Sequence, residues 1–202
     1  MSTVTPQNYI HLAIRTESVL PESKTLPAGT WRLLHAALGM VTELAELMGS
    51  NAFTSASHGM SADENQIEEV GDVFWYLAIA YDELGDLENE LSFIDDFNAY
   101  WSQPRGMGLH DAIIAASEFV DVLKRMIFYG KAGEQQRACV HLRMVLLRLM
   151  DHCQSLGIDP RHAMAANIRK LTARFPTKFD ADHAVQRDLN AERSALRAEV
   201  PQ

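Results

Sequence analysis

Apolar residues recur along this chain with the helical period of 3.6 residues. No stretch shows the strict alternation of apolar and polar residues that predicts a β-strand. Clusters of Pro, Gly, Ser and Asn divide the pattern into segments. The predicted fold class is therefore all-α, a helical bundle. The expected helices cover Thr5–Ser18 and residues 31–49, 62–85, 86–102, 111–130, 134–156 and 160–174.

The chain is long enough for one substantial hydrophobic core. We expect residues 1–180 to form a single all-α domain. Residues 181–202 are alanine-rich and charged, which indicates either a docking helix or a partly disordered tail. Pro27 and Gly29 are expected to break the chain before the helix at 31–49 begins.

Two pairs of carboxylates stand at helical spacing within the first half of the chain. They are Glu43-x-x-Glu46 and Glu69-x-x-Asp72, and residues three apart are neighbours on a helix surface. The helix that carries the first pair is otherwise mostly apolar, and buried carboxylates need a partner or a metal ion. If the two helices pack antiparallel, all four carboxylates meet in one cleft.

Four gathered carboxylates raise one another's pKa values unless cations intervene. Oxygen ligands without His or Cys select Mg²⁺ or Mn²⁺. The alternative is that these are surface acids, because acids in a first turn complement the helix dipole. That alternative accounts for Glu64 and Glu68, and it partly explains the presence of Glu69. It does not explain Glu43 and Glu46, which lie in mid-helix. The residues therefore favour a metal site.

The second half of the chain repeats the pattern of the first. Residues 111–123 resemble 32–48, and residues 140–158 resemble 68–86. We therefore predict an internal duplication of a helix pair.

The predicted copy retains only one of the two acidic pairs. Glu118 and Asp121 keep the first pair, but His141 and Met144 stand where the second pair would be. Arg125, four residues after Asp121, can neutralise the remaining acids. One working site for each chain is the expected result.

Net charge and hydrophobicity indicate which classes of partner the protein does not bind. The net charge of −9 argues against binding a nucleic-acid polymer. The first residues lack the basic and apolar regions of a signal peptide, and no apolar run is long enough to span a membrane. A cytoplasmic protein without membrane partners is expected, with Cys139 and Cys153 as buried reduced thiols.

The two acidic motifs, ELAE at 43–46 and EVGD at 69–72, resemble those of the all-α nucleoside triphosphate pyrophosphohydrolases. This group includes MazG, the dimeric dUTPases and phosphoribosyl-ATP pyrophosphohydrolase. Further segments resemble its phage MazG-like members: VLKRMIFYGK (122–131), ANIRKLTARFPTKFD (166–180) and RDLNAER (187–193). The resemblance extends from about Leu33 to Arg193.

The resemblance implies hydrolysis of a nucleoside triphosphate between its α and β phosphates, which yields a monophosphate and pyrophosphate. It also implies Mg²⁺, with Mn²⁺ as a substitute, bound by Glu43, Glu46, Glu69 and Asp72, one of which can also orient the attacking water. The basic and amide residues that it implies as substrate contacts are Lys124, Lys131, Asn167, Lys170 and Arg174.

Other family properties are implied in the same way. Relatives form homodimers or homotetramers, so a second chain can complete the pocket, and a phage-encoded member acts in the host cytoplasm. The phage branch called MazZ is purine-selective and removes (d)GTP, which is one candidate substrate. Met40 and Thr42 depart from the Glu and Gly of many members, which bears on the base pocket more than on the metal site.

Three further side chains are candidates for contact with a nucleotide base: Trp31, His35 and Tyr76. Each of them could instead pack in the core. The dipeptide His110-Asp111 is a weak signal for a phosphohydrolase, because Asp111 suits a helix cap. A di-iron site is disfavoured because no Glu has a His three residues later. A non-catalytic helical protein that binds metal or nucleotide on this scaffold remains the alternative function.

Overall fold

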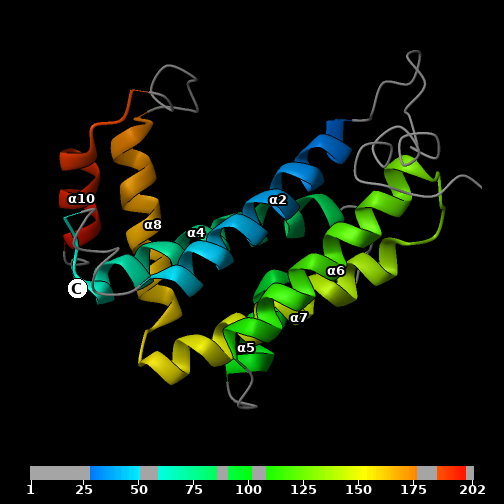
Figure 1. Ribbon diagram of the computed structural model, residues 1–202, viewed down its shortest axis with the longest axis horizontal. Helices are drawn as coiled ribbons and strands as arrows, with labels where there is room; N and C mark the ends of the chain where they lie inside the picture. The colour runs from blue at the N-terminus through cyan, green and yellow to red at the C-terminus, as the bar shows by residue number, and fades with distance from the viewer. Residues whose placement is uncertain (1–27, 51–58, 86–90, 102–107, 177–185, 199–202) are drawn as a thin grey trace, which may run out of the picture.

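The computed structural model describes residues 28–50, 59–85, 91–101, 108–176 and 186–198, and every regular element in these ranges is an α-helix (Figure 1). The predicted all-α class is confirmed. The helices are α2 (Ala28–Gly49), α4 (Ala62–Gly85), α5 (Phe93–Trp101), α6 (Leu109–Phe128), α7 (Gln135–Leu156), α8 (Pro160–Arg174) and α10 (Leu189–Arg197). The helix expected at Thr5–Ser18 and the domain boundary expected at 180 lie outside the described residues.

Most helix bounds follow the predicted ones closely, with two corrections. Helix α2 already begins at Ala28, so the break expected at Gly29 is wrong. A continuous helix over 86–102 is also wrong, since α5 begins at Phe93. Ser92 starts it by accepting a hydrogen bond from the Asp95 N–H (3.2 Å), which satisfies a donor of the first turn.

Local capping explains two other helix starts. At α4, the Glu64 N–H donates to Ser61 Oγ (3.1 Å) and the Ser61 N–H donates back to the Glu64 carboxylate (2.8 Å). At α6, Asp111 does not start the helix. Its carboxylate instead accepts from the Gly108 N–H one turn earlier (3.3 Å), a capping role that accounts for this acid without catalysis.

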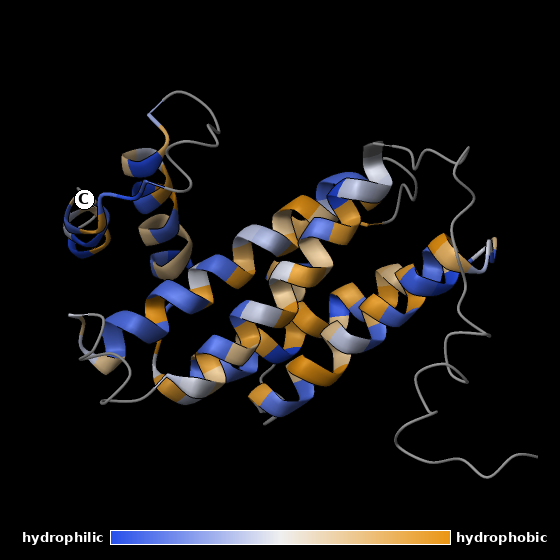
Figure 2. Ribbon diagram, turned by 45° about the horizontal axis from the view of Figure 1, so that its top comes forward, coloured by the Kyte–Doolittle hydropathy of each residue, from blue (hydrophilic) through white to orange (hydrophobic). Residues whose placement is uncertain are grey.

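Two antiparallel helix pairs share one hydrophobic core. Helix α2 packs on α4, α6 packs on α7, and further contacts join α2 to α6 and α4 to α7. Leu44, Leu77, Phe119 and Leu146 are fully buried in this core. Figure 2 shows the apolar faces of the helices turned toward one another. Burying each such side chain contributes about 1.5–3 kcal/mol. None of the described helices is long and apolar enough to cross a membrane.

The acids of the second helix pair have partners within that pair. Glu118 on α6 lies 3.1 Å from Nδ1 of His141 on α7. Asp121 pairs with both Lys124 and Arg125, so the contact predicted between Asp121 and Arg125 is confirmed. The two cysteines are free and buried, as expected.

Helices α8 and α10 pack together at one end of the molecule, and α8 crosses the N-terminal half of α4 (Figure 1). Gly71 lies at this crossing. A Cβ atom there would stand 2.8 Å from the Ala163 carbonyl oxygen and 2.8 Å from Asn167 Cβ. Only glycine permits so close an approach of the two helices.

We predict that Gly71→Ala lowers the free energy of unfolding by about 1–3 kcal/mol, because the added methyl group forces α8 away from α4. Gly49→Ala is the matched control, since its Cβ would meet nothing within 4 Å. The control is expected to gain up to about 1 kcal/mol through helix propensity. Urea denaturation measures both effects. Equal stability of the two variants would contradict this account of the crossing.

Candidate functional site

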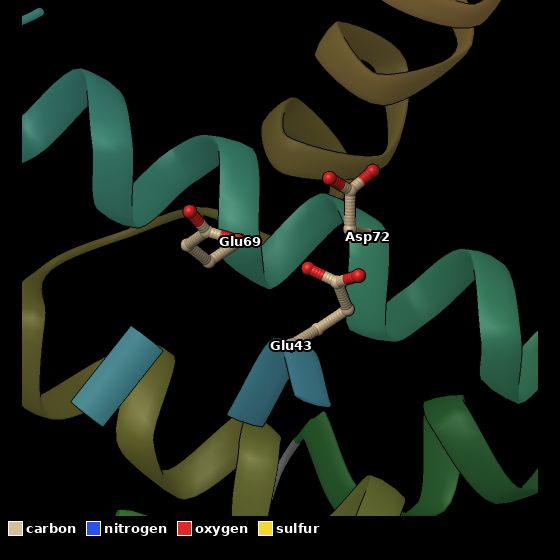
Figure 3. Close-up of side chains that lie close together, drawn as sticks. All are labelled: Glu43, Glu69 and Asp72. Atoms are coloured by element: carbon tan, nitrogen blue, oxygen red, sulfur yellow. The ribbon is translucent and has the colours of Figure 1, made fainter. Parts of the chain in front are cut away.

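Three carboxylates converge between α2 and α4. Glu43 extends from α2 toward Glu69 and Asp72 on α4, as Figure 3 shows. Each offers one oxygen atom, and these three atoms all lie within 4.8 Å of one another. Glu46, one turn further along α2, is more exposed but lines the same cavity. All four acids that the spacing indicated therefore line one cavity, but only Glu43, Glu69 and Asp72 form the close group.

The acids form one part of a cavity of about 780 Å³ bounded by α2, α4, α8 and α10. A volume of this size is typical of small-molecule sites. Its charged and aromatic lining falls into three groups. The acids are Glu43, Glu46, Glu68, Glu69, Asp72 and Glu192, the bases are Lys170, Arg174, Arg187 and Arg193, and the rings are His35, Trp75, Tyr76 and Phe175.

Burial and the charges of neighbouring acids raise the pKa values of two cavity carboxylates. Burial, reinforced by the charges of Asp72 and Glu46, raises the pKa of Glu43 to about 7. Burial together with Glu46 and Glu43 raises the pKa of Glu69 to about 9. The fold therefore buries these two carboxylates among other acids, and both effects disfavour their charged forms.

Among the three close carboxylates, Asp72 is the one that has both a cationic and an amide partner on α8. Lys170 Nζ lies 2.5 Å from Asp72 Oδ2 and 3.1 Å from Glu68, and the Asn167 side-chain amide donates to Asp72 Oδ1. Burial raises the pKa of Asp72 although Lys170 opposes this shift. Burial alone would lower the pKa of Lys170, but Asp72 and Glu68 outweigh it and raise that pKa. Lys170 is therefore a buried cation that fixes Asp72.

Three rings gather beside the acids. The His35 ring meets the Tyr76 ring edge-on at 5.4 Å between centroids, and Trp75 lies 4.8 Å from Tyr76. Gly39 makes room for this arrangement, because a Cβ atom there would overlap the Tyr76 ring. His35 and Tyr76 thus line the cavity, and their contact with a base stays a prediction. Trp31 does not line the cavity, because it lies at the start of α2 with 57% of its surface exposed.

The remaining predicted substrate contacts divide between the two ends of the molecule. Arg174, Asn167 and Lys170 belong to α8, which borders the cavity. Lys124 and Lys131 do not line it. Lys124 pairs with Asp121, and Lys131 Nζ lies 2.7 Å from Glu134, at the far end of the α6–α7 pair.

Several cavity residues were missed from the sequence. Glu68, Trp75, Arg187, Glu192 and Arg193 line the cavity without having been assigned a role. Three of these lie in the segment 187–193, whose resemblance to phage proteins was the only signal for them. Glu192 is 3% exposed, and burial alone would raise its pKa. Hydrogen bonds from Arg174 and Arg187 outweigh burial and lower that pKa to about 2.

The donor set suits a hard divalent cation. Within the described residues the group that could hold an ion contains carboxylates alone, without His or Cys. Such oxygen ligands fit Mg²⁺ or Mn²⁺ rather than zinc. A cation there would also favour the charged forms of Glu43 and Glu69, whose pKa values burial and the neighbouring acids raise.

Comparisons with known proteins do not identify the chain. No protein-family model, curated protein or solved structure matches it.

We predict that stability without divalent cations falls as the pH rises, and that Glu69→Gln removes much of this fall. The pKa of Glu69 is near 4.5 in the unfolded chain and about 9 in the fold, so the folded state binds this proton more tightly. Its contribution to stability is therefore complete below about pH 4.5 and is lost as the pH rises toward about 9.

Urea denaturation at pH 5, 7 and 9 in the presence of a chelator measures this effect. Asp63→Asn, which removes an exposed carboxylate outside the cavity, is the control and should follow the wild type. Parallel profiles for wild type and Glu69→Gln would show that the fold does not perturb Glu69.

Proposed function

We propose that this protein is a Mg²⁺-dependent nucleoside triphosphate pyrophosphohydrolase of the MazG-like all-α type. The observation that carries the proposal is a single cavity lined by both acids and bases. Glu43, Glu69 and Asp72 gather where a divalent cation suits them, while Arg174 and Arg187 border the same space. A metal-bound polyphosphate requires this combination of charges.

The architecture supports the proposal. The acidic motifs of α2 and α4 face one another in an antiparallel helix pair, and α6 and α7 form a second pair. We propose that the two pairs descend from a duplicated hairpin. The MazG-type bundle and the duplication both rest on the sequence resemblance together with this pairing of helices.

In the proposed reaction a water molecule attacks the α phosphorus of the triphosphate. The new bond joins the water oxygen to that phosphorus, and the bond from the α phosphorus to the oxygen that bridges it to the β phosphate breaks, so pyrophosphate leaves. A Mg²⁺ ion would neutralise phosphate charge and polarise the water.

The chain's own groups supply the remaining steps. Glu43, Glu69 and Asp72 would hold the ion, and Lys170 and Asn167 keep Asp72 in place. Glu46 lines the cavity outside this three-residue group, and we assign it the role of accepting the proton of the attacking water.

The aromatic group gives the cavity a place for a base. His35, Trp75 and Tyr76 present ring faces and edges on which a purine or pyrimidine can stack. A purine nucleotide such as (d)GTP belongs to the proposed substrates. We also propose a homodimer or homotetramer in the cytoplasm. Trp31 and Leu38, seven residues apart on α2 and 57% and 54% exposed, provide an apolar face for such contacts.

We predict that the purified protein releases pyrophosphate from at least one member of a panel of NTPs and dNTPs when Mg²⁺ or Mn²⁺ is added. Hydrolysis in ¹⁸O-labelled water should place the label in the nucleoside monophosphate, because attack is at the α phosphorus. Label in the pyrophosphate would show attack at the β phosphorus and would refute the proposed mechanism.

Glu46→Gln and Asp72→Asn should each lower kcat at least about 100-fold, the usual scale for losing a proton acceptor or an ionic ligand. Circular dichroism should show both variants folded, and Glu118→Gln should keep full activity. No turnover of any nucleotide, together with no heat of Mg²⁺ binding by calorimetry, would favour a non-catalytic interaction protein instead.

A further inference from the structure

Two arginines meet on one buried carboxylate beside the acidic group. Arg174, the last residue of α8, donates to Glu192 from Nε (2.9 Å) and Nη2 (2.6 Å). Arg187, just before α10, donates to the same carboxylate from Nε (3.2 Å) and Nη2 (2.6 Å). A third of the way along α10, Glu192 thus joins two separate parts of the chain.

The helix that carries Glu192 is fixed by contacts away from this carboxylate. Asp188 caps its start by accepting hydrogen bonds from the Asn190 and Ala191 N–H groups. Near its end, Arg169 of α8 donates to the Ala195 carbonyl (3.1 Å), and Arg197 pairs with Glu64 of α4 (2.7 Å). The arginine pair therefore belongs to a supported wall of the cavity and not to a loose tail.

Arg174 and Arg187 have a positive charge and hydrogen-bond donors that are available to a ligand. One carboxylate neutralises only one of the two guanidinium groups, so this group of three residues keeps one net positive charge. Each contact with Glu192 uses Nε or Nη2, which leaves Nη1 of Arg174 and of Arg187 outside that pairing. Both arginines border the cavity, and the charge of Arg174 acts on the pKa of Asp72.

We propose that Arg174 and Arg187, held side by side by Glu192, bind the terminal phosphates of the substrate and the pyrophosphate that leaves. This inference rests on the proposed function and extends it to residues outside the acidic group. Planar guanidinium groups fit phosphate oxygens better than lysines do. Glu192 is the positioning residue, because side chains already fixed in the bound geometry lose less freedom when the ligand arrives.

The test is calorimetric titration of the full chain with inorganic pyrophosphate, with and without Mg²⁺. We expect Arg174→Gln and Arg187→Gln each to weaken pyrophosphate binding roughly 10- to 100-fold, the scale of a lost charged hydrogen bond. Arg137→Gln is the control. It removes the same charge from an exposed site on α7 and should bind like the wild type. Titration with Mg²⁺ alone should still show binding in all variants.

A separate variant tests whether Glu192 positions the two arginines. Glu192→Gln should weaken pyrophosphate binding while it leaves Mg²⁺ binding intact. Stronger pyrophosphate binding would overturn the positioning role, since it would mean that Glu192 competes with phosphate for the arginines.

The outcomes separate this inference from the proposed function. If Mg²⁺ binds and nucleotides are hydrolysed, but both arginine variants bind pyrophosphate as Arg137→Gln does, the phosphate site is wrong and the metal site stands. If Mg²⁺ does not bind and no nucleotide is hydrolysed, the proposed function fails. Pyrophosphate binding without metal, weakened by Arg187→Gln, would then still support the arginine site.

Discussion

The close crossing of α8 over α4 is the contact on which the site depends. Gly71 permits it by leaving no side chain between the helices, and Asn167 and Lys170 then reach Asp72 from α8. The same helix ends at Arg174, which joins Glu192 on α10. A glycine inside the acidic motif therefore governs how both charged walls of the cavity come together.

The charges of the cavity are balanced unevenly. Asp72 and Glu192 each have cationic partners, whereas burial and the neighbouring acids raise the pKa of Glu43 to about 7 and that of Glu69 to about 9. Holding two carboxylates in this state lowers the stability of the metal-free fold. Proteins keep such unfavourable arrangements mainly where a ligand offsets them, and a divalent cation among the acids would do so.

The second helix pair shows why acids at helical spacing are not sufficient for a site. Glu118 and Asp121 repeat the spacing of Glu43 and Glu46, but Glu118 contacts His141 and Asp121 pairs with Arg125 within the second helix pair. The first pair differs because α8 packs over its acids and encloses them beside the cavity. Enclosure by a third helix, and not acid spacing alone, makes the first pair chemically distinctive.

The sequence by itself predicted most of the helices and the acids that meet in the cavity, because both follow from local spacing. Apolar residues at a period of 3.6 predicted α4 to the residue, and acids three apart on an apolar helix indicated Glu43 and Glu46. The tertiary structure alone decided which cations meet the acids. Lys170 reaches Asp72 across 98 positions of sequence, and Asn167 reaches the same carboxylate across 95. Contacts over such distances depend on how whole helices pack, and no local spacing encodes them.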